Sequence, residues 1–235
     1  MMRPLAVKRP ELPDGLVAIP VRTRLVRPGD DLASIVVEAV RGIARPGDVL
    51  AVSETAVAIA QGQAVAAELV RPSNLAYFLS QRAGALATVS QPESLQIVID
   101  QVGPAKVLYA SVMHVLGRFA GRRGMFYEIM GEAITAIDGY TGTLPPFERA
   151  IVFAPRDPDG FSQSVHDLCG VACAVVDAND LEKAKVLGAS AGVDRTNVEY
   201  ALLANPHGNS DEQTPIVVLK WRGDGMHPLL EAELE

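Results

Sequence analysis

Short apolar segments that lie between turn-forming residues most constrain the fold of this chain. Six such segments, each of strand length, are rich in Val, Ile, Leu and Ala: residues 17–25, 49–52, 133–137, 151–154, 173–176 and 216–220. Between them, apolar residues recur at helical spacing, and helices are predicted at 32–43, 72–78, 92–102, 159–168 and 196–203. Strands and helices mixed in this way predict an α+β fold, with mixed sheets and flanking helices.

The length and composition indicate how the chain is organised. Its 235 residues suffice for one large domain or two closely packed small ones, and a hydrophobic content of 49% supports a sizeable core. Prolines at positions 4, 10 and 13 interrupt regular structure near the start. We therefore expect a flexible leader at 1–15, a single domain at 16–223 and an acidic tail at 224–235.

Charge and the distribution of special residues exclude several classes of protein. The formal net charge of −7 argues against nucleic acid as a partner. No run of 18 apolar residues and no secretory leader is found, so we expect a cytoplasmic protein that does not enter a membrane. Cys169 and Cys173 lack the spacing of a zinc site and are predicted to be small buried side chains, and the four histidines are scattered.

Common nucleotide-binding and nucleophile motifs are absent. The chain contains no Gly-Lys pair, which rules out a P-loop, and no G-x-G-x-x-G after a strand, which leaves a Rossmann cofactor site unsupported. A G-x-S-x-G nucleophile elbow is also missing. Any chemistry must therefore come from other residues.

Acidic residues at the ends of predicted strands are the candidates for that chemistry. Asp138 follows the segment 133–137, Asp177 follows 173–176, and Asp157 and Asp159 follow 151–154. Carboxylates in these places can gather a hard cation such as Mg²⁺ or Mn²⁺. Aspartate is also a favoured turn and helix-cap residue, so on spacing alone a metal site and a purely structural role both stay open.

A series of short motifs gives the sequence a resemblance to a known family. In chain order they are P-G-D-D-L (28–32), G-D-V-L-A-V-S (47–53), A-Q-G-Q (60–63), P-S-N-L-A (72–76), I-T-A-I-D (134–138), P-R-D-P-D (155–159), V-V-D (175–177) and T-P-I-V-V-L-K-W-R-G (214–223). With these motifs the chain resembles the γ-glutamyl ligases of coenzyme F-420 from about residue 17 to 223. The resemblance implies a fold of two intertwined α+β subdomains and a homodimer.

The resemblance also implies the residues of a site. Asp138 and Asp177 match the metal-binding aspartates, and Asn179 or Asp180 would supply a further oxygen ligand. The residues expected near a bound GTP are Leu25, Val26, Ser53, Glu54 and Thr141.

Arginines in the middle of the chain are candidates for binding an anionic substrate. Arg118, Arg122 and Arg123 could hold a carboxylate or phosphate, since a guanidinium group matches both in a bidentate manner. The alternative is a solvated basic loop.

The implied reaction adds L-glutamate through an amide bond to a deazaflavin precursor of coenzyme F-420, with GTP as co-substrate and Mg²⁺ or Mn²⁺ as cofactor. The sequence departs from the family at Ile59, where a lysine is usual, at Ala178, where a hydroxyl residue is usual, and at Thr141, where an asparagine is usual. Two alternatives therefore remain: a related ligase with another acceptor, and a non-catalytic relative that binds a nucleotide or cofactor.

Overall fold

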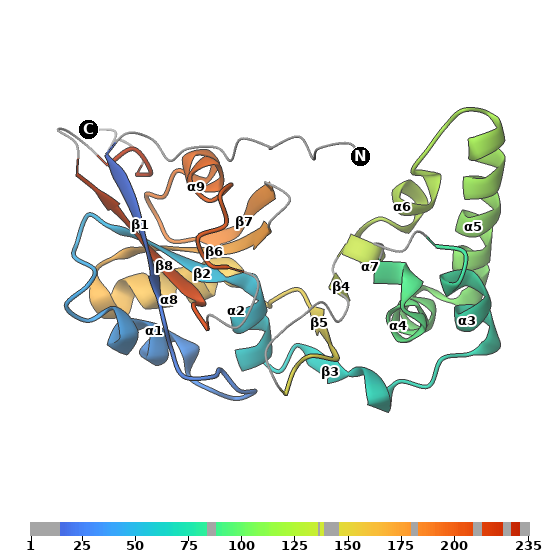
Figure 1. Ribbon diagram of the computed structural model, residues 1–235, viewed down its shortest axis with the longest axis horizontal. Coiled ribbons are helices and arrows are strands. Elements are labelled where there is room, and N and C mark those ends of the chain that lie inside the picture. The colour runs from blue at the N-terminus through green and yellow to red at the C-terminus, as the bar shows by residue number, and fades with distance from the viewer. Residues whose placement is uncertain are drawn as a thin grey trace, which may run out of the picture. The chain divides into compact units, whose positions relative to one another are not determined.

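The computed structural model describes residues 15–83, 88–135, 137–138, 146–179, 183–208, 213–222 and 227–230 (Figure 1). The chain forms two compact units: unit 1 comprises Met1–Gln63 and Pro155–Glu235, and unit 2 comprises Ala64–Ala154. Each unit has its own sheet and its own core. The predicted leader, apart from residue 15, lies outside the described residues.

Unit 1 is built on a five-stranded mixed sheet. Its strands, in spatial order, are β1 (Leu16–Val21), β8 (Ile216–Trp221), β2 (Val49–Ser53), β6 (Ala172–Asn179) and β7 (Lys183–Ala189). β2 and β6 run parallel, and the other neighbours are antiparallel. A mixed sheet with flanking helices confirms the predicted α+β class.

Helices cover both faces of this sheet (Figure 1). Val49 and Ala51 of β2 belong to the same core cluster as Val198 of α9 (Arg195–Ala201). Leu50 and Val52 alternate with them and are also fully buried, as expected for a central strand with both faces covered. α1 (Leu32–Val40) packs against α8 (Pro158–Cys169), which contacts β6 and β7. α2 (Glu54–Ala60) follows β2 directly.

Helix caps explain where two of these helices begin. Asp31 accepts hydrogen bonds from the backbone N–H of Ser34 at 3.2 Å and from its hydroxyl at 2.6 Å, so α1 starts at Leu32 as the P-G-D-D turn predicts. Asp194 caps α9 in the same way through the N–H of Asn197 at 3.0 Å.

Within the predicted acidic tail, Leu229 is buried in the core of unit 1.

Unit 2 combines a small antiparallel sheet with a group of helices. The strands lie in the order β3 (Ala64–Ala66), β5 (Ala150–Phe153) and β4 (Ile137–Asp138). The helices are η1 (Ala67–Leu69), α3 (Asn74–Ser80), η2 (Thr88–Ser90), α4 (Pro92–Val102), α5 (Pro104–Phe119), α6 (Met125–Met130) and α7 (Glu132–Thr135). Pro92 and Pro104 occupy first helical positions, where their missing N–H costs nothing.

No helix of the described residues is long and apolar enough to cross a membrane.

The structure corrects the predicted strand at 133–137. Residues 132–135 form α7 instead, and β4 comprises Ile137 and Asp138. A short apolar run fits a buried helical turn as well as a strand, and Ile134 is buried in the core of unit 2 from the helical turn. Asp177 likewise lies inside β6, which continues to Asn179, and does not follow the strand.

Candidate functional site

The parallel strands β2 and β6 bring several predicted site residues to one edge of the sheet. Ser53 pairs in register with Val176, so the residues that follow, Glu54 and Asp177, lie at the same level of the sheet edge. Ligands of open α/β sheets bind outside the carboxyl ends of parallel strands. Two residues predicted to approach a nucleotide and one predicted metal ligand therefore meet where such a site is expected.

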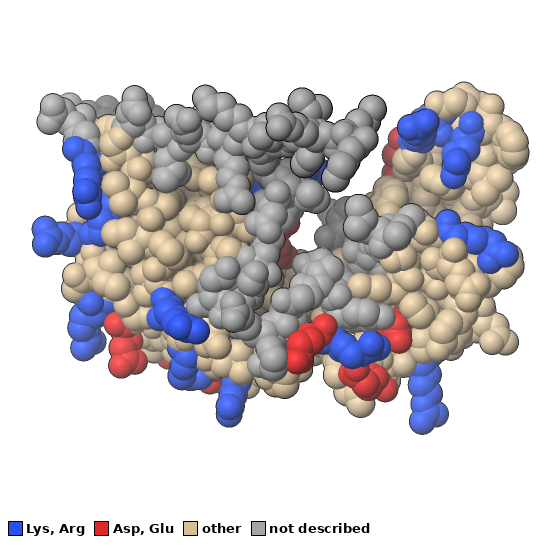
Figure 2. All heavy atoms as spheres, in the orientation of Figure 1, with Lys and Arg blue, Asp and Glu red and all other residues tan. Residues whose placement is uncertain are grey.

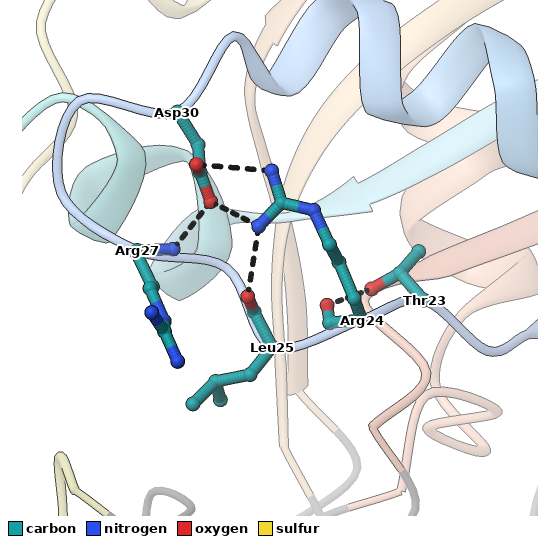
Figure 3. Close-up of polar contacts among 5 residues, drawn as sticks. All are labelled: Thr23, Arg24, Leu25, Arg27 and Asp30. Carbon is teal, nitrogen blue, oxygen red and sulfur yellow. Dashed lines mark hydrogen bonds and ion pairs between the residues drawn. The ribbon is translucent and has the colours of Figure 1, made fainter.

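The loop that carries Leu25 and Val26 is held by an internal ion pair (Figure 3). Asp30 accepts hydrogen bonds from Nη1 and Nη2 of Arg24 at 2.7 and 3.0 Å, and from the backbone N–H of Arg27 at 2.7 Å. Arg24 also donates to the carbonyl of Leu25 at 3.2 Å. The hydrogen bond from Arg24, followed by that from Arg27, lowers the pKa of Asp30, so its carboxylate is ionised at neutral pH.

Backbone hydrogen bonds attach this loop to the edge of the sheet. The N–H of Gly29 donates to the carbonyl of Ala60 at the end of α2 at 2.8 Å, and the N–H of Thr23 donates to Gln213 at 3.1 Å. The N–H of Ser53 donates to the carbonyl of Pro215 at 2.8 Å. Segment 213–215 therefore neighbours both the loop and the end of β2. The strand predicted at 17–25 ends at Val21, because the chain turns into the loop there.

His207 holds the same segment and was not singled out from the sequence. Its Nδ1 lies 3.2 Å from the carbonyl of Thr214, whose hydroxyl donates to the carbonyl of His207 at 2.5 Å. Burial lowers the pKa of His207 to about 4, so the imidazole is neutral in the folded protein. Its burial depends on long-range packing, which no local pattern reveals.

Asp177 is the one predicted metal ligand whose side chain the structure describes. It is exposed on β6, in register with Lys185 of β7. Desolvation by neighbouring atoms raises the pKa of its carboxyl group, while the charge of Lys185 acts in the opposite direction. Lys183 lies two residues from Lys185 on the same face of β7 and is also exposed.

The predicted donor set is therefore only partly described. Asp138 belongs to unit 2, and its side chain, like Asp180 and Thr141, lies outside the described residues. Among the described residues, no group of three or more His, Cys, Asp or Glu side chains could hold a metal ion. The single carboxylate of Asp177 is not enough to form a metal site, so the convergence of Asp138 and Asp177 stays a prediction.

For the acids of the P-R-D-P-D segment, the structure favours the structural role. Asp157 caps α8 by accepting from the N–H of Gly160 at 2.9 Å. Asp159 accepts from the N–H of Ala189 at 2.9 Å and forms an ion pair with Arg195, which together lower its pKa. Asp157 thus caps α8, and Asp159 joins α8 to β7 and α9.

The A-Q-G-Q and P-R-D-P-D motifs are in contact within unit 1. Gln61 Nε2 donates to the carbonyl of Arg156 at 2.9 Å, and the N–H of Arg156 donates to Gln61 Oε1 at 2.6 Å. Ile59, the first departure from the family pattern, is buried on α2 with 5% of its surface exposed. Ala178, the second, is half-buried on β6.

The three arginines predicted to bind an anion all belong to unit 2 and differ in their surroundings. Arg122 pairs with Glu128 at 3.3 Å, and Arg123 is exposed. Arg118 lines a cavity beside α5. Their roles toward a substrate stay predictions.

The fold is that of an α+β protein with a mixed sheet. Its candidate ligand site lies at the carboxyl ends of the parallel strands β2 and β6, next to the attached loop. Residues 20–214 match the F420-0:Gamma-glutamyl ligase family, and the chain belongs to this family. The resemblance seen in the sequence motifs is thereby confirmed.

A comparison with curated proteins identifies a relative from the same family. The chain is 28% identical over 157 residues to the Coenzyme F420:L-glutamate ligase of Methanopyrus kandleri. The match covers 65% of this chain and 54% of the relative, so the chain spans about half the length of the relative that it matches.

The ion pair of the loop leads to a testable prediction. In Asp30→Asn, the amide exchange of Arg27 and of the rest of the loop should become severalfold faster, because the carboxylate that accepts from Arg24 and Arg27 is lost. Hydrogen–deuterium exchange measures this effect. Asp31→Asn is the matched control, since it removes a neighbouring charge but keeps a side chain that can cap α1. Equal exchange in the two variants would show that the ion pair does not order the loop.

Proposed function

We propose that this protein is a ligase that joins L-glutamate through an amide bond to a precursor of coenzyme F-420, and that the reaction uses GTP and a divalent cation. The observation that carries the proposal is the family match over residues 20–214, which extends through both units. The name of the relative from Methanopyrus kandleri agrees with it. As the resemblance implies, the protein would act as a homodimer.

The edge of the sheet in unit 1 is the proposed nucleotide site. Ser53 and Glu54 lie at the carboxyl end of β2, and the loop with Leu25 and Val26 is attached to the same region. Ile59 is buried and does not present a polar group there. The exposed Lys183 and Lys185 would supply positive charge toward the phosphates in place of the lysine that is usual in the family.

Asp177 is the proposed contribution of unit 1 to binding a cation. Its exposed carboxylate oxygens can coordinate a metal ion. Desolvation raises the pKa of its carboxyl group, and a bound cation would act in the opposite direction and favour the ionised form. A divalent cation bound to GTP neutralises charge that develops on the phosphates.

The proposed reaction has two steps. A carboxylate oxygen of the acceptor attacks the γ-phosphorus of GTP, which forms an acyl phosphate and releases GDP. The amine nitrogen of glutamate then attacks the acyl carbon, the carbon–oxygen bond to phosphate breaks, and the amine loses a proton. The products are the amide, GDP and inorganic phosphate, and holding the reactants together accounts for much of the rate enhancement.

The test is a direct assay of the purified protein with the F-420 precursor, L-glutamate, GTP and MnCl₂. Mass spectrometry should detect a product with one added glutamyl residue, formed together with GDP. Asp177→Asn should lower kcat/KM by about a hundredfold, in the range that loss of an electrostatic contact at a reacting centre produces. Asp167→Asn, which removes an exposed carboxylate from α8 of the same unit, should have no effect. Failure to form product with either GTP or ATP would overturn the proposed function.

A further inference from the structure

Unit 2 contains a cavity of about 640 Å³ that none of the proposed ligation steps uses. Its walls come from α3, α4, α5 and α6, together with η2. Leu79, Leu95 and Val115 line it with aliphatic groups, and Phe119 and Phe126 line it with aromatic rings. The volume lies in the range of pockets that bind small organic molecules, roughly 300–1,000 Å³.

The polar groups of the cavity wall are positively charged or neutral. Two arginines, Arg82 and Arg118, contribute to the described lining, which contains no Asp or Glu. Arg82 is held in place, since its guanidinium carbon lies 3.6 Å from the centre of the Phe78 ring and its Nη1 donates to the carbonyl of Phe78 at 2.7 Å. The guanidinium group of Arg118 makes no hydrogen bond or ion pair with another described residue.

His114 adds a buried polar atom to the same wall. Its Nδ1 is inaccessible to solvent and has no hydrogen-bond partner among the described residues. A buried polar atom without a partner costs free energy, so His114 is an unsatisfied polar point in this wall.

Large apolar side chains remain exposed around this cavity. Phe119, Val115 and Tyr127, which all line it, are exposed by 88%, 52% and 45%. In Figure 2 Lys and Arg side chains gather where α5 leads into α6 and another lies over the middle of α5, with uncharged surface around them. An apolar surface with cations at one end complements a molecule that has an apolar body and an anionic head.

We propose that the cavity of unit 2 binds a small amphipathic anion, with an apolar or aromatic body and one carboxylate or phosphate group. The body would contact Leu79, Leu95 and Phe126, and the anionic head would bind Arg118, with Arg82 a second cation in the same lining. The inference stands on unit 2 alone and does not depend on the ligase activity.

Three naphthalene compounds with the same ring system test the proposal by titration calorimetry on the full-length protein. They are 2-naphthoate, 2-naphthyl phosphate and the neutral 2-naphthalenemethanol. At least one anion should bind at least about fivefold more tightly than the alcohol, the difference expected for a partly exposed ion pair. The anion that binds better identifies the head group. Equal binding of all three compounds, or no binding, would overturn the proposal.

Two pairs of variants locate the binding. Arg118→Gln should reduce anion affinity about fivefold and leave the affinity for the alcohol unchanged. Lys106→Gln removes the same charge from α5 about 18 Å away, at a rise of 1.5 Å per residue, and should change neither.

Val115→Trp should weaken the binding of all three compounds because it fills the cavity, whereas Val112→Trp, at an exposed position of the same helix outside the lining, should not. All four substituted positions are exposed, so the variants are expected to fold. Identical binding by the two members of either pair would contradict the proposed site.

Discussion

Gly188→Ala should destabilise unit 1 by about 3 kcal/mol, at the upper end of what overpacking costs. Gly188 lies on β7 where this strand passes the start of α8. A Cβ atom there would contact the backbone C of Pro158 and N of Asp159 and would lie 2.6 Å from the carbonyl oxygen of Pro158. Backbone atoms cannot rotate away as a flexible side chain can, so strand and helix would have to separate.

Urea denaturation followed by circular dichroism measures the loss, as a shift of the midpoint at constant slope. The separation should also weaken the hydrogen bond from Ala189 N–H to Asp159. Gly192→Ala is the control: its φ of +78° is unfavourable for alanine, but a Cβ there meets nothing within 4 Å. It should cost only about 1 kcal/mol. If the two variants lose the same stability, the close approach of β7 to α8 does not constrain residue 188.

Acidification should destabilise unit 1 through His207. The pKa of this residue is lowered by burial from 6.5 to about 4. In the unfolded chain the imidazole takes up a proton near pH 6.5, whereas in the folded protein it stays neutral down to about pH 4. The stabilising contribution is therefore complete above pH 6.5 and is lost as the pH falls from 6.5 to 4. At 1.36 kcal/mol per pKa unit, the loss amounts to about 3 kcal/mol.

His207→Phe should reduce the dependence of the free energy of unfolding on pH between 6.5 and 4, measured by urea denaturation at several pH values. The variant also loses the contact with Thr214, so its stability at pH 7 will be lower. The slope against pH is therefore the readout, because a pH-independent packing loss does not change it. His227, whose pKa burial also lowers, should retain part of the slope. A slope identical to that of the unmodified protein would refute the assignment to His207.

The predicted elements with a clear period agree with the structure. Residues 49–52 and 216–219 are apolar throughout and lie in β2 and β8, and the cap at Asp31 starts α1 as expected. Local sequence carries such information because side-chain periodicity and caps act within a few residues. β7, α2, α5 and α6 were not predicted. β7 is mostly polar or half-buried, α2 and α6 are short, and the apolar residues of α5 show only a weak helical period.

The site shows the same division between local and long-range information. The sequence motifs identified Ser53, Glu54 and Asp177 as separate candidates, and the parallel register of β2 and β6 brought them to one edge. The role of Asp159 could not be predicted, because it depends on Ala189 of a strand 30 residues away.

The sequence by itself determined the family, the α+β class and most strands and helices, because these follow from short patterns and their order along the chain. The tertiary structure decided which acids cap a helix and which reach solvent, why residue 188 must be glycine, and that the helices of unit 2 form an open cavity lined by Arg118. These properties depend on contacts between residues far apart in the chain, and burial and register are defined only once such contacts exist.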